Sequence, residues 1–123
     1  MKPIMIYSFE KLKAWQEARN LAKDIYMLIN KFPKVEQFAL CDQMRRAAIS
    51  IPSNIAEGNA RTSSKERIHF LEFAYGSLME IYCQSILAND LGYIDNCDLD
   101  YIKEKIQNVS KLISGLKTSL EKR

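Results

Sequence analysis

Apolar residues recur every three or four positions along four long stretches of the chain, the spacing of amphipathic helices. The connections between these stretches are short, and Pro33 disfavours a helical conformation at Phe32, where the first stretch ends. Four long helices joined by short connections predict one all-α domain over residues 1–123, an antiparallel up-down-up-down four-helix bundle. The predicted helices cover residues 9–31, 38–59, 64–91 and 98–121.

Polar residues and glycines indicate where several of these helices begin and end. Ser63 followed by Glu66 has the spacing of a capping box, which predicts that the third helix begins directly after Ser63. Asp98 is a suitable N-cap for the last helix. Gly92 is suited to end the third helix, and Gly58 tolerates a left-handed conformation at the end of the second.

The second helix carries two stripes of different chemistry. Its apolar stripe consists of Leu40, Met44, Ala47, Ala48, Ile51 and Ile55. Its polar stripe consists of Arg46, Ser50, Asn54, Glu57 and Arg61. Arginine and glutamate side chains one turn apart on such a stripe are able to pair. Pro52 removes a backbone donor within the helix, but the apolar spacing keeps its phase on both sides, which predicts a kinked, continuous helix.

The third helix has more apolar residues than one core-facing stripe requires. The stripe predicted to face the core consists of Ile68, Leu71, Ala74, Tyr75, Leu78, Ile81, Tyr82 and Ile86. Four further apolar residues project elsewhere: Phe70, Phe73, Leu87 and Leu91. Each Phe or Leu left in water forgoes about 1.5–3 kcal/mol of hydrophobic stabilisation.

Two explanations for this surplus are open. In the first, a wide helix face packs inside the protomer, covered by the N-terminal lead with its Ile4, Ile6 and Tyr7. In the second, other copies of the chain cover the face, and the small residues Gly76 and Ser77 let another backbone approach. We expect the second explanation and a stable homo-oligomer. The predicted oligomer interface consists of Phe70, Phe73, Gly76, Ser77, Leu87 and Leu91.

Charge and cysteine content narrow the functional class only slightly. The 18 basic and 15 acidic residues leave a net charge of +3, a mild bias compared with dedicated nucleic-acid binders. Cys41, Cys83 and Cys97 are an odd number without a CxxC spacing, which indicates free thiols in a reduced, cytoplasmic protein. No apolar run has the length of a signal peptide or a membrane span, so we expect neither a leader nor membrane contact.

The sequence offers few combinations of residues that could form a catalytic or metal site. Glu66 and His69 form an ExxH pair, but a di-iron bundle requires a second such pair, and His69 is the sole histidine. A cysteine–histidine nucleophile would also have to use His69, and no local motif supports it. Glycine-rich phosphate-binding motifs are absent. We therefore expect no catalytic residues, no metal, no cofactor and no small-molecule substrate.

Three runs of residues resemble a known family. FEKLKAWQEARNLAKDIY, FPKVEQFALCDQMRRAAISIPSNIAEGNAR and FLEFAYGSLMEI are similar to the small bacterial four-helix bundle proteins encoded in intervening sequences of 23S ribosomal RNA genes. The resemblance covers nearly the whole chain. It implies a left-handed antiparallel bundle that assembles as a homopentamer. It also implies kinship with the accessory variability protein of diversity-generating retroelements, a basic barrel that associates with nucleic acid and a reverse transcriptase.

The resemblance also singles out residues. The positions that match the family's shared pattern are Arg45, Arg46, Ser50, Asn54, Glu57, Gly58, Arg61, Gly76, Ser77 and Glu80. In a structural interpretation, a buried or interfacial polar network consists of Arg46, Ser50, Asn54, Glu57 and Glu80. In a functional interpretation, the residues that face RNA or a nucleoprotein partner are Arg45, Arg46, Arg61, Lys65 and Arg67. A second basic group on the last helix consists of Lys103, Lys105, Lys111 and Lys117.

Two functional hypotheses follow from these observations. The first is a non-catalytic, oligomeric helical bundle that binds RNA or a nucleic-acid-processing protein through basic surface on the assembled ring. Five copies would carry five times +3, or +15, which favours attraction of a polyanion. The alternative is a protein–protein scaffold or accessory module that makes no contact with nucleic acid.

Overall fold

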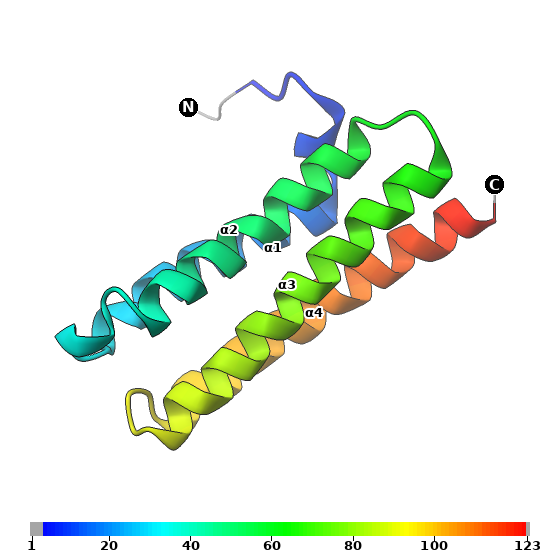
Figure 1. Cartoon of the computed structure of the whole chain (residues 1–123). Helices are drawn as coiled ribbons and strands as arrows, with labels where there is room; N and C mark the ends of the chain where they lie inside the picture. Colours follow the sequence, from blue (N-terminus) through cyan, green and yellow to red (C-terminus); the bar gives the residue numbers. More distant parts are fainter. Residues whose placement is uncertain (1–3, 123) are drawn as a thin grey trace.

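The computed structural model describes residues 4–122 and contains four α-helices within that range (Figure 1). They are α1 (Lys13–Leu28), α2 (Leu40–Asn59), α3 (Ser64–Asp90) and α4 (Asn96–Glu121). Short 3₁₀ helices cover Ser8–Lys11, Ile29–Lys31 and Lys34–Glu36. The described part of the chain contains no strand, so the prediction of an all-α protein with four helices is confirmed. The two ends predicted for the first helix are 3₁₀ turns, because Leu12 is extended at its start and Phe32 at its end.

Each helix packs against its sequence neighbours, and α1 also packs against α4. In Figure 1, α2 and α3 lie side by side in front of α1 and α4. The apolar stripe predicted on α2 lies in the core: Met44, Ala47, Ala48, Ile51 and Ile55 are buried, and Leu40 is half-buried against them. The helix runs without interruption through Pro52, as its apolar spacing predicts. The core stripe of α4 consists of Ile102, Ile106, Val109 and Ile113.

The core stripe of α3 differs from the predicted one. Tyr75 and Ile86 are 41% and 38% exposed, whereas the polar Ser85 is fully buried. The Ser85 hydroxyl is accommodated because it donates a hydrogen bond to the Ile81 carbonyl oxygen at 2.7 Å. Regular steps of three and four give the observed buried stripe: Leu71, Ala74, Leu78, Ile81, Ser85 and Ala88.

The ends of α3 agree with the sequence prediction. The Ser63 hydroxyl oxygen accepts a hydrogen bond from the Glu66 backbone N–H at 3.1 Å. Gly92 has φ +78°, the left-handed conformation that ends a helix cheaply only at glycine. The backbone N–H groups of Gly92 and Tyr93 donate to the carbonyls of Asn89 and Ala88, which completes a Schellman motif.

The N-cap of α4 was predicted wrongly. Asp95 caps the helix, which begins at Asn96, and Asp98 is the third helical residue. The Asp98 N–H donates to the Asp95 carboxylate at 2.8 Å, and the Asp98 carboxylate accepts from the Asp95 N–H at 3.3 Å. Two aspartates three positions apart therefore form a capping box, and the upstream one is the cap.

The N-terminal lead does not pack on the bundle. Ile4, Ile6 and Tyr7 are 85%, 73% and 67% exposed, so the first of the two explanations, in which the lead covers the surplus face of α3, is wrong. The base of the lead is fixed by other contacts: Glu10 accepts hydrogen bonds from the backbone N–H groups of Ile6 and Tyr7. No α-helix within residues 4–122 is long and apolar enough to span a membrane.

Candidate interaction surfaces on α2 and α3

A polar seam joins the middle of α2 to the middle of α3. The Ser77 hydroxyl donates to the Ser50 hydroxyl at 2.8 Å, and the Asn54 amide donates to the same Ser50 oxygen at 2.8 Å. Ser77 is only 8% exposed, because it lies on the side of α3 that faces α2. Ser77 therefore contributes to packing inside the protomer and is not available to the predicted oligomer interface.

Two charged residues next to this seam, Arg46 and Glu80, are exposed to solvent. Arg46 and Glu80 line a shallow depression between α2 and α3, together with Ser50 and Ser77. Both charged side chains are exposed, and within residues 4–122 neither forms an ion pair. Arg46 therefore forms no ion pair with any carboxylate of residues 4–122.

The remaining members of the predicted network lie elsewhere. The Glu57 carboxylate pairs with the guanidinium of Arg61, which follows the end of α2, at 2.9 Å. Glu57 is three turns from Arg46, about 16 Å along the helix axis. Within the described protomer, the hydrogen bonds and ion pairs therefore do not join these five residues into one network, and a network at an interface between copies stays a prediction.

Gly58 permits the close approach of α2 and α3. A Cβ at this position would lie 2.9 Å from the Cβ of Phe70 and 3.3 Å from the Arg67 carbonyl oxygen. Both neighbours are near the backbone and cannot move away cheaply. The predicted role of Gly58 as a left-handed helix end is wrong, because Gly58 is helical and the right-handed Ala60 is the C-cap.

An arginine corner forms where α2 passes into α3. The Arg61 guanidinium lies 4.8 Å from the centre of the Phe70 ring, and Phe70 is half-buried. The Nε of Arg67 donates to the Arg61 carbonyl oxygen at 2.6 Å. Arg67 is half-buried as a result, whereas Lys65 is exposed and unpaired among the described residues.

The predicted basic group is thus divided between two places. Arg45 lies near the start of α2, where it pairs with Asp42 at 2.9 Å, and Arg46 is its neighbour. Arg61 follows the end of α2, about 20 Å further along. On α4, Lys105 lies 5.4 Å from the Tyr101 ring, Lys103 and Lys111 are exposed, and Lys117 lines a groove against α3. No single basic patch gathers these residues within one protomer.

Comparison with known proteins decides the family. The family model described as 23S rRNA-intervening sequence protein matches residues 10–115. The chain belongs to this family. A crystal structure of a protein with unknown function from the S23 ribosomal protein family of Bacteroides thetaiotaomicron VPI-5482 is similar in fold, with a TM-score of 0.78 and 21% identity. The match covers 85% of this chain and 97% of that chain. No protein with a curated description matches the chain.

In this member of the 23S rRNA-intervening sequence protein family, much of the surplus apolar surface of α3 faces solvent. Phe73, Leu87 and Leu91 are 49%, 47% and 57% exposed. Gly76 is also exposed, and a Cβ there would meet no neighbouring atom. His69 is exposed beside Phe73, with 4.4 Å between the ring centres. The exposed lead does not cover this face, so packing within the protomer accounts for Phe70 alone among the four surplus residues.

Sequence reasoning missed an apolar groove between α1 and α2. Its floor and walls include Tyr26, Met27, Ile49 and Pro52, and Met27 is 70% exposed. Arg19 and Lys23 belong to the same lining. The signal was present in the sequence, because Met27 and Ile49 lie off the core-facing stripes of their helices.

Four groups that lie outside these surfaces have shifted pKa values. Lys31 donates to Asp98 at 2.7 Å, which lowers the pKa of Asp98 and raises that of Lys31. The hydrogen bond to Glu36 at 2.7 Å raises the pKa of Tyr93. Burial raises the pKa of the Cys41 thiol, which argues against a reactive thiolate. The described residues contain no group of three or more His, Cys, Asp or Glu side chains arranged to hold a metal ion.

Proposed function

We propose that this chain is a non-catalytic, cytoplasmic helical bundle that assembles with copies of itself and binds RNA or a nucleoprotein partner through the assembled basic surface. The single observation that carries the assembly is the exposure of Phe73, Leu87 and Leu91 in the protomer. Large apolar side chains that are exposed along one side of a helix are typical of an interface. The assembly we propose is a homopentameric ring of antiparallel up-down-up-down bundles, as the family resemblance implies.

Support for a polyanionic partner comes from unpaired positive charge. Arg46 and Lys65 carry charges that no acidic side chain neutralises within residues 4–122. Arg45 and Arg61 are partly neutralised by Asp42 and Glu57, so we expect them to contribute less. Copies arranged in a ring would bring these separated charges around one particle with a net charge of +15, five times +3.

An electrophoretic mobility-shift titration with a structured fragment of 23S rRNA tests this proposal. Binding should weaken steeply with salt. Arg46→Gln with Lys65→Gln should weaken it further, and the salt slope should fall by about one unit for each phosphate that the variant no longer neutralises. Lys13→Gln is the matched control, because Lys13 lies on α1 and already pairs with Glu17 at 3.7 Å. Absence of binding at low salt, or binding that salt does not change, would remove the electrostatic mechanism.

The alternative function is a protein–protein scaffold without nucleic-acid contact. The apolar groove of Tyr26, Met27, Ile49 and Pro52 favours it, because such a groove fits an apolar side chain better than a phosphate backbone. Co-purification before and after nuclease treatment separates the two functions. A partner that is lost with nuclease supports RNA binding, and a protein partner that is retained supports the scaffold.

A further inference from the structure

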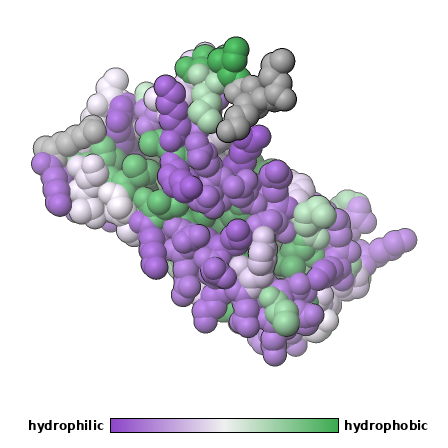
Figure 2. All heavy atoms as spheres, turned by 180° about the vertical axis from the view of Figure 1, so that it is seen from behind, coloured by the Kyte–Doolittle hydropathy of each residue, from purple (hydrophilic) through white to green (hydrophobic). Residues whose placement is uncertain are grey.

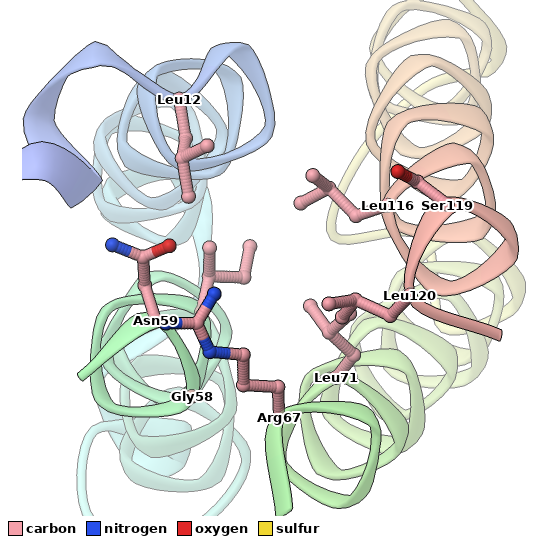
Figure 3. A pocket seen from close by; sticks show the side chains of 9 residues that line it. Leu12, Gly58, Asn59, Arg67, Leu71, Leu116, Ser119 and Leu120 are labelled. Atoms are coloured by element: carbon pink, nitrogen blue, oxygen red, sulfur yellow. The ribbon is translucent and has the colours of Figure 1, made fainter. Parts of the chain in front are cut away.

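A partly open cavity of about 130 Å³ lies at one end of the bundle, where α2, α3, α4 and Leu12, the residue before α1, form the wall (Figure 3). Seen from behind, hydrophobic residues lie between hydrophilic ones on the half of the molecule where α4 ends (Figure 2). The cavity is lined mainly by aliphatic side chains: Leu12, Ile55, Leu71, Leu116 and Leu120.

Three polar side chains also belong to the wall: Asn59, Arg67 and Ser119. The Arg67 side chain reaches from α3 toward Asn59 of α2 (Figure 3). Its Nε is fixed by the hydrogen bond to the Arg61 carbonyl at 2.6 Å, and the Asn59 amide is occupied by the Ser8 hydroxyl at 2.7 Å. The polar side of the cavity is therefore held in place by contacts that do not involve a ligand.

The guanidinium of Arg67 lacks a counter-charge in the described structure. No carboxylate of residues 4–122 pairs with it, and its one hydrogen bond uses Nε. Its terminal nitrogens are therefore free to bind a carboxylate in the two-point geometry that guanidinium favours. A half-buried cation beside an aliphatic cavity selects a ligand with an anionic head and an apolar body.

We propose that this cavity binds a small monocarboxylic acid, with the carboxylate on Arg67 and the hydrocarbon part against the leucines and Ile55. The volume limits the size of the ligand, since an aliphatic protein cavity of about 150 Å³ holds one benzene molecule. A chain or ring of about six carbons therefore fits, and hexanoate is a suitable probe. This site is separate from the proposed RNA-binding residues Arg46 and Lys65, so either proposal can fail without the other.

Isothermal titration calorimetry with sodium hexanoate tests the proposal on the full chain, in a buffer free of carboxylates and phosphate. We expect saturable binding with a dissociation constant of about 1 mM or lower, which is reachable for a ligand of this size. Hexan-1-ol should bind about tenfold more weakly or worse, because it offers no charge to Arg67. Methyl chemical shifts of the lining leucines should move, whereas the methyl signals of Leu87 and Leu91 should not.

Arg67→Met should weaken hexanoate binding by about tenfold or more and leave hexan-1-ol binding almost unchanged. The matched control is Arg46→Met, which removes an exposed arginine far from the cavity and should change neither. Leu116→Phe should reduce binding of both probes by filling the cavity, and it serves as the second test if Arg67→Met does not fold. No saturable hexanoate binding, equal affinities for hexanoate and hexan-1-ol, or methyl shifts outside the cavity would each overturn the proposal.

Discussion

α3 and α4 have nearly equal lengths, 27 and 26 residues, but they distribute their apolar side chains differently. In α4, the isoleucines at 102, 106 and 113 and Val109 form one buried stripe. In α3, a buried stripe is accompanied by Phe73 and Leu87, which are about half exposed. The comparison shows that the protomer core buries one apolar stripe on each helix, whereas α3 carries further large apolar side chains that face outward.

Replacing a buried core side chain with alanine should have the largest effect on the free energy of unfolding. The effect should be similar on α3 and α4. Ile81 of α3 and Ile106 of α4 are 0% and 3% exposed. Replacing either with alanine should lower the free energy of unfolding by about 2–5 kcal/mol, measured by urea denaturation followed by circular dichroism. Leu87→Ala is the outward control and should change it by less than about 0.5 kcal/mol at protein concentrations low enough to favour protomers. A core-sized loss for Leu87→Ala would contradict the assignment of two surfaces.

Two glycine substitutions should have opposite signs. Gly58→Ala should destabilise the fold by about 1–2 kcal/mol, because overpacking against Phe70 exceeds the gain in helix propensity. Gly115→Ala, on α4, meets no neighbouring atom and should stabilise the fold by about 0.5–1 kcal/mol. Thermal unfolding of the two variants beside the parent chain checks both signs. Stabilisation by Gly58→Ala would refute the close-approach argument.

Removal of the N-cap of α4 should have a moderate effect. Asp95→Ala deletes the acceptor of the Asp98 N–H and should lower the free energy of unfolding by about 0.5–2 kcal/mol. Ser63→Ala is the corresponding variant on α3 and should cost a similar amount through the Glu66 N–H. Chemical denaturation of both variants measures the two costs. No loss for Asp95→Ala would mean that Asp98 or water replaces the cap.

The Lys31–Asp98 ion pair should have the smallest effect on stability, which should be seen in how the free energy of unfolding depends on pH. The hydrogen bond from Lys31 lowers the pKa of Asp98 below its ordinary 3.8, so the pair stabilises the fold above that pH. This stabilisation should be lost as the pH falls through the lowered pKa of the folded state. Because Lys31 also has a raised pKa, the contribution should be lost again as the pH rises above 10.5. Asp98→Asn should flatten both limbs of the stability curve, and an unchanged acid limb would contradict this assignment.

Much of the fold was predictable from the sequence because local signals agree with the tertiary packing. The apolar spacing of α2 predicted its core stripe, and Gly92 predicted the end of α3 through its left-handed backbone. The prediction of the α4 N-cap failed because two residues near the start of the helix are both suitable caps. Asp95 and Asp98 are both good caps, and only the geometry of the chain before α4 selects Asp95.

The candidate surfaces were less predictable because they depend on distances between helices. Periodicity placed Arg46 and Glu57 on one stripe about three turns apart and Glu57 one turn before Arg61, but it could not show that Ser77 of α3 is the hydrogen-bond partner of Ser50. It also could not show that Gly58 lies against Phe70, or that Arg67 lines a cavity together with residues of α2 and α4. By contrast, the surplus of apolar residues on α3 was visible in the sequence, and Phe73, Leu87 and Leu91 are exposed in the structure.

Sedimentation equilibrium of the full chain at micromolar concentration tests the central claim, that copies of the chain cover the outward face of α3. We expect a mass of several chains for the parent protein, against 14.2 kDa for one chain. The variant Phe73→Ser, Leu87→Ser, Leu91→Ser should shift toward the mass of one chain and retain its helical circular dichroism. A parent protein that sediments as a single chain, or a triple variant that keeps the full assembly mass, would contradict it.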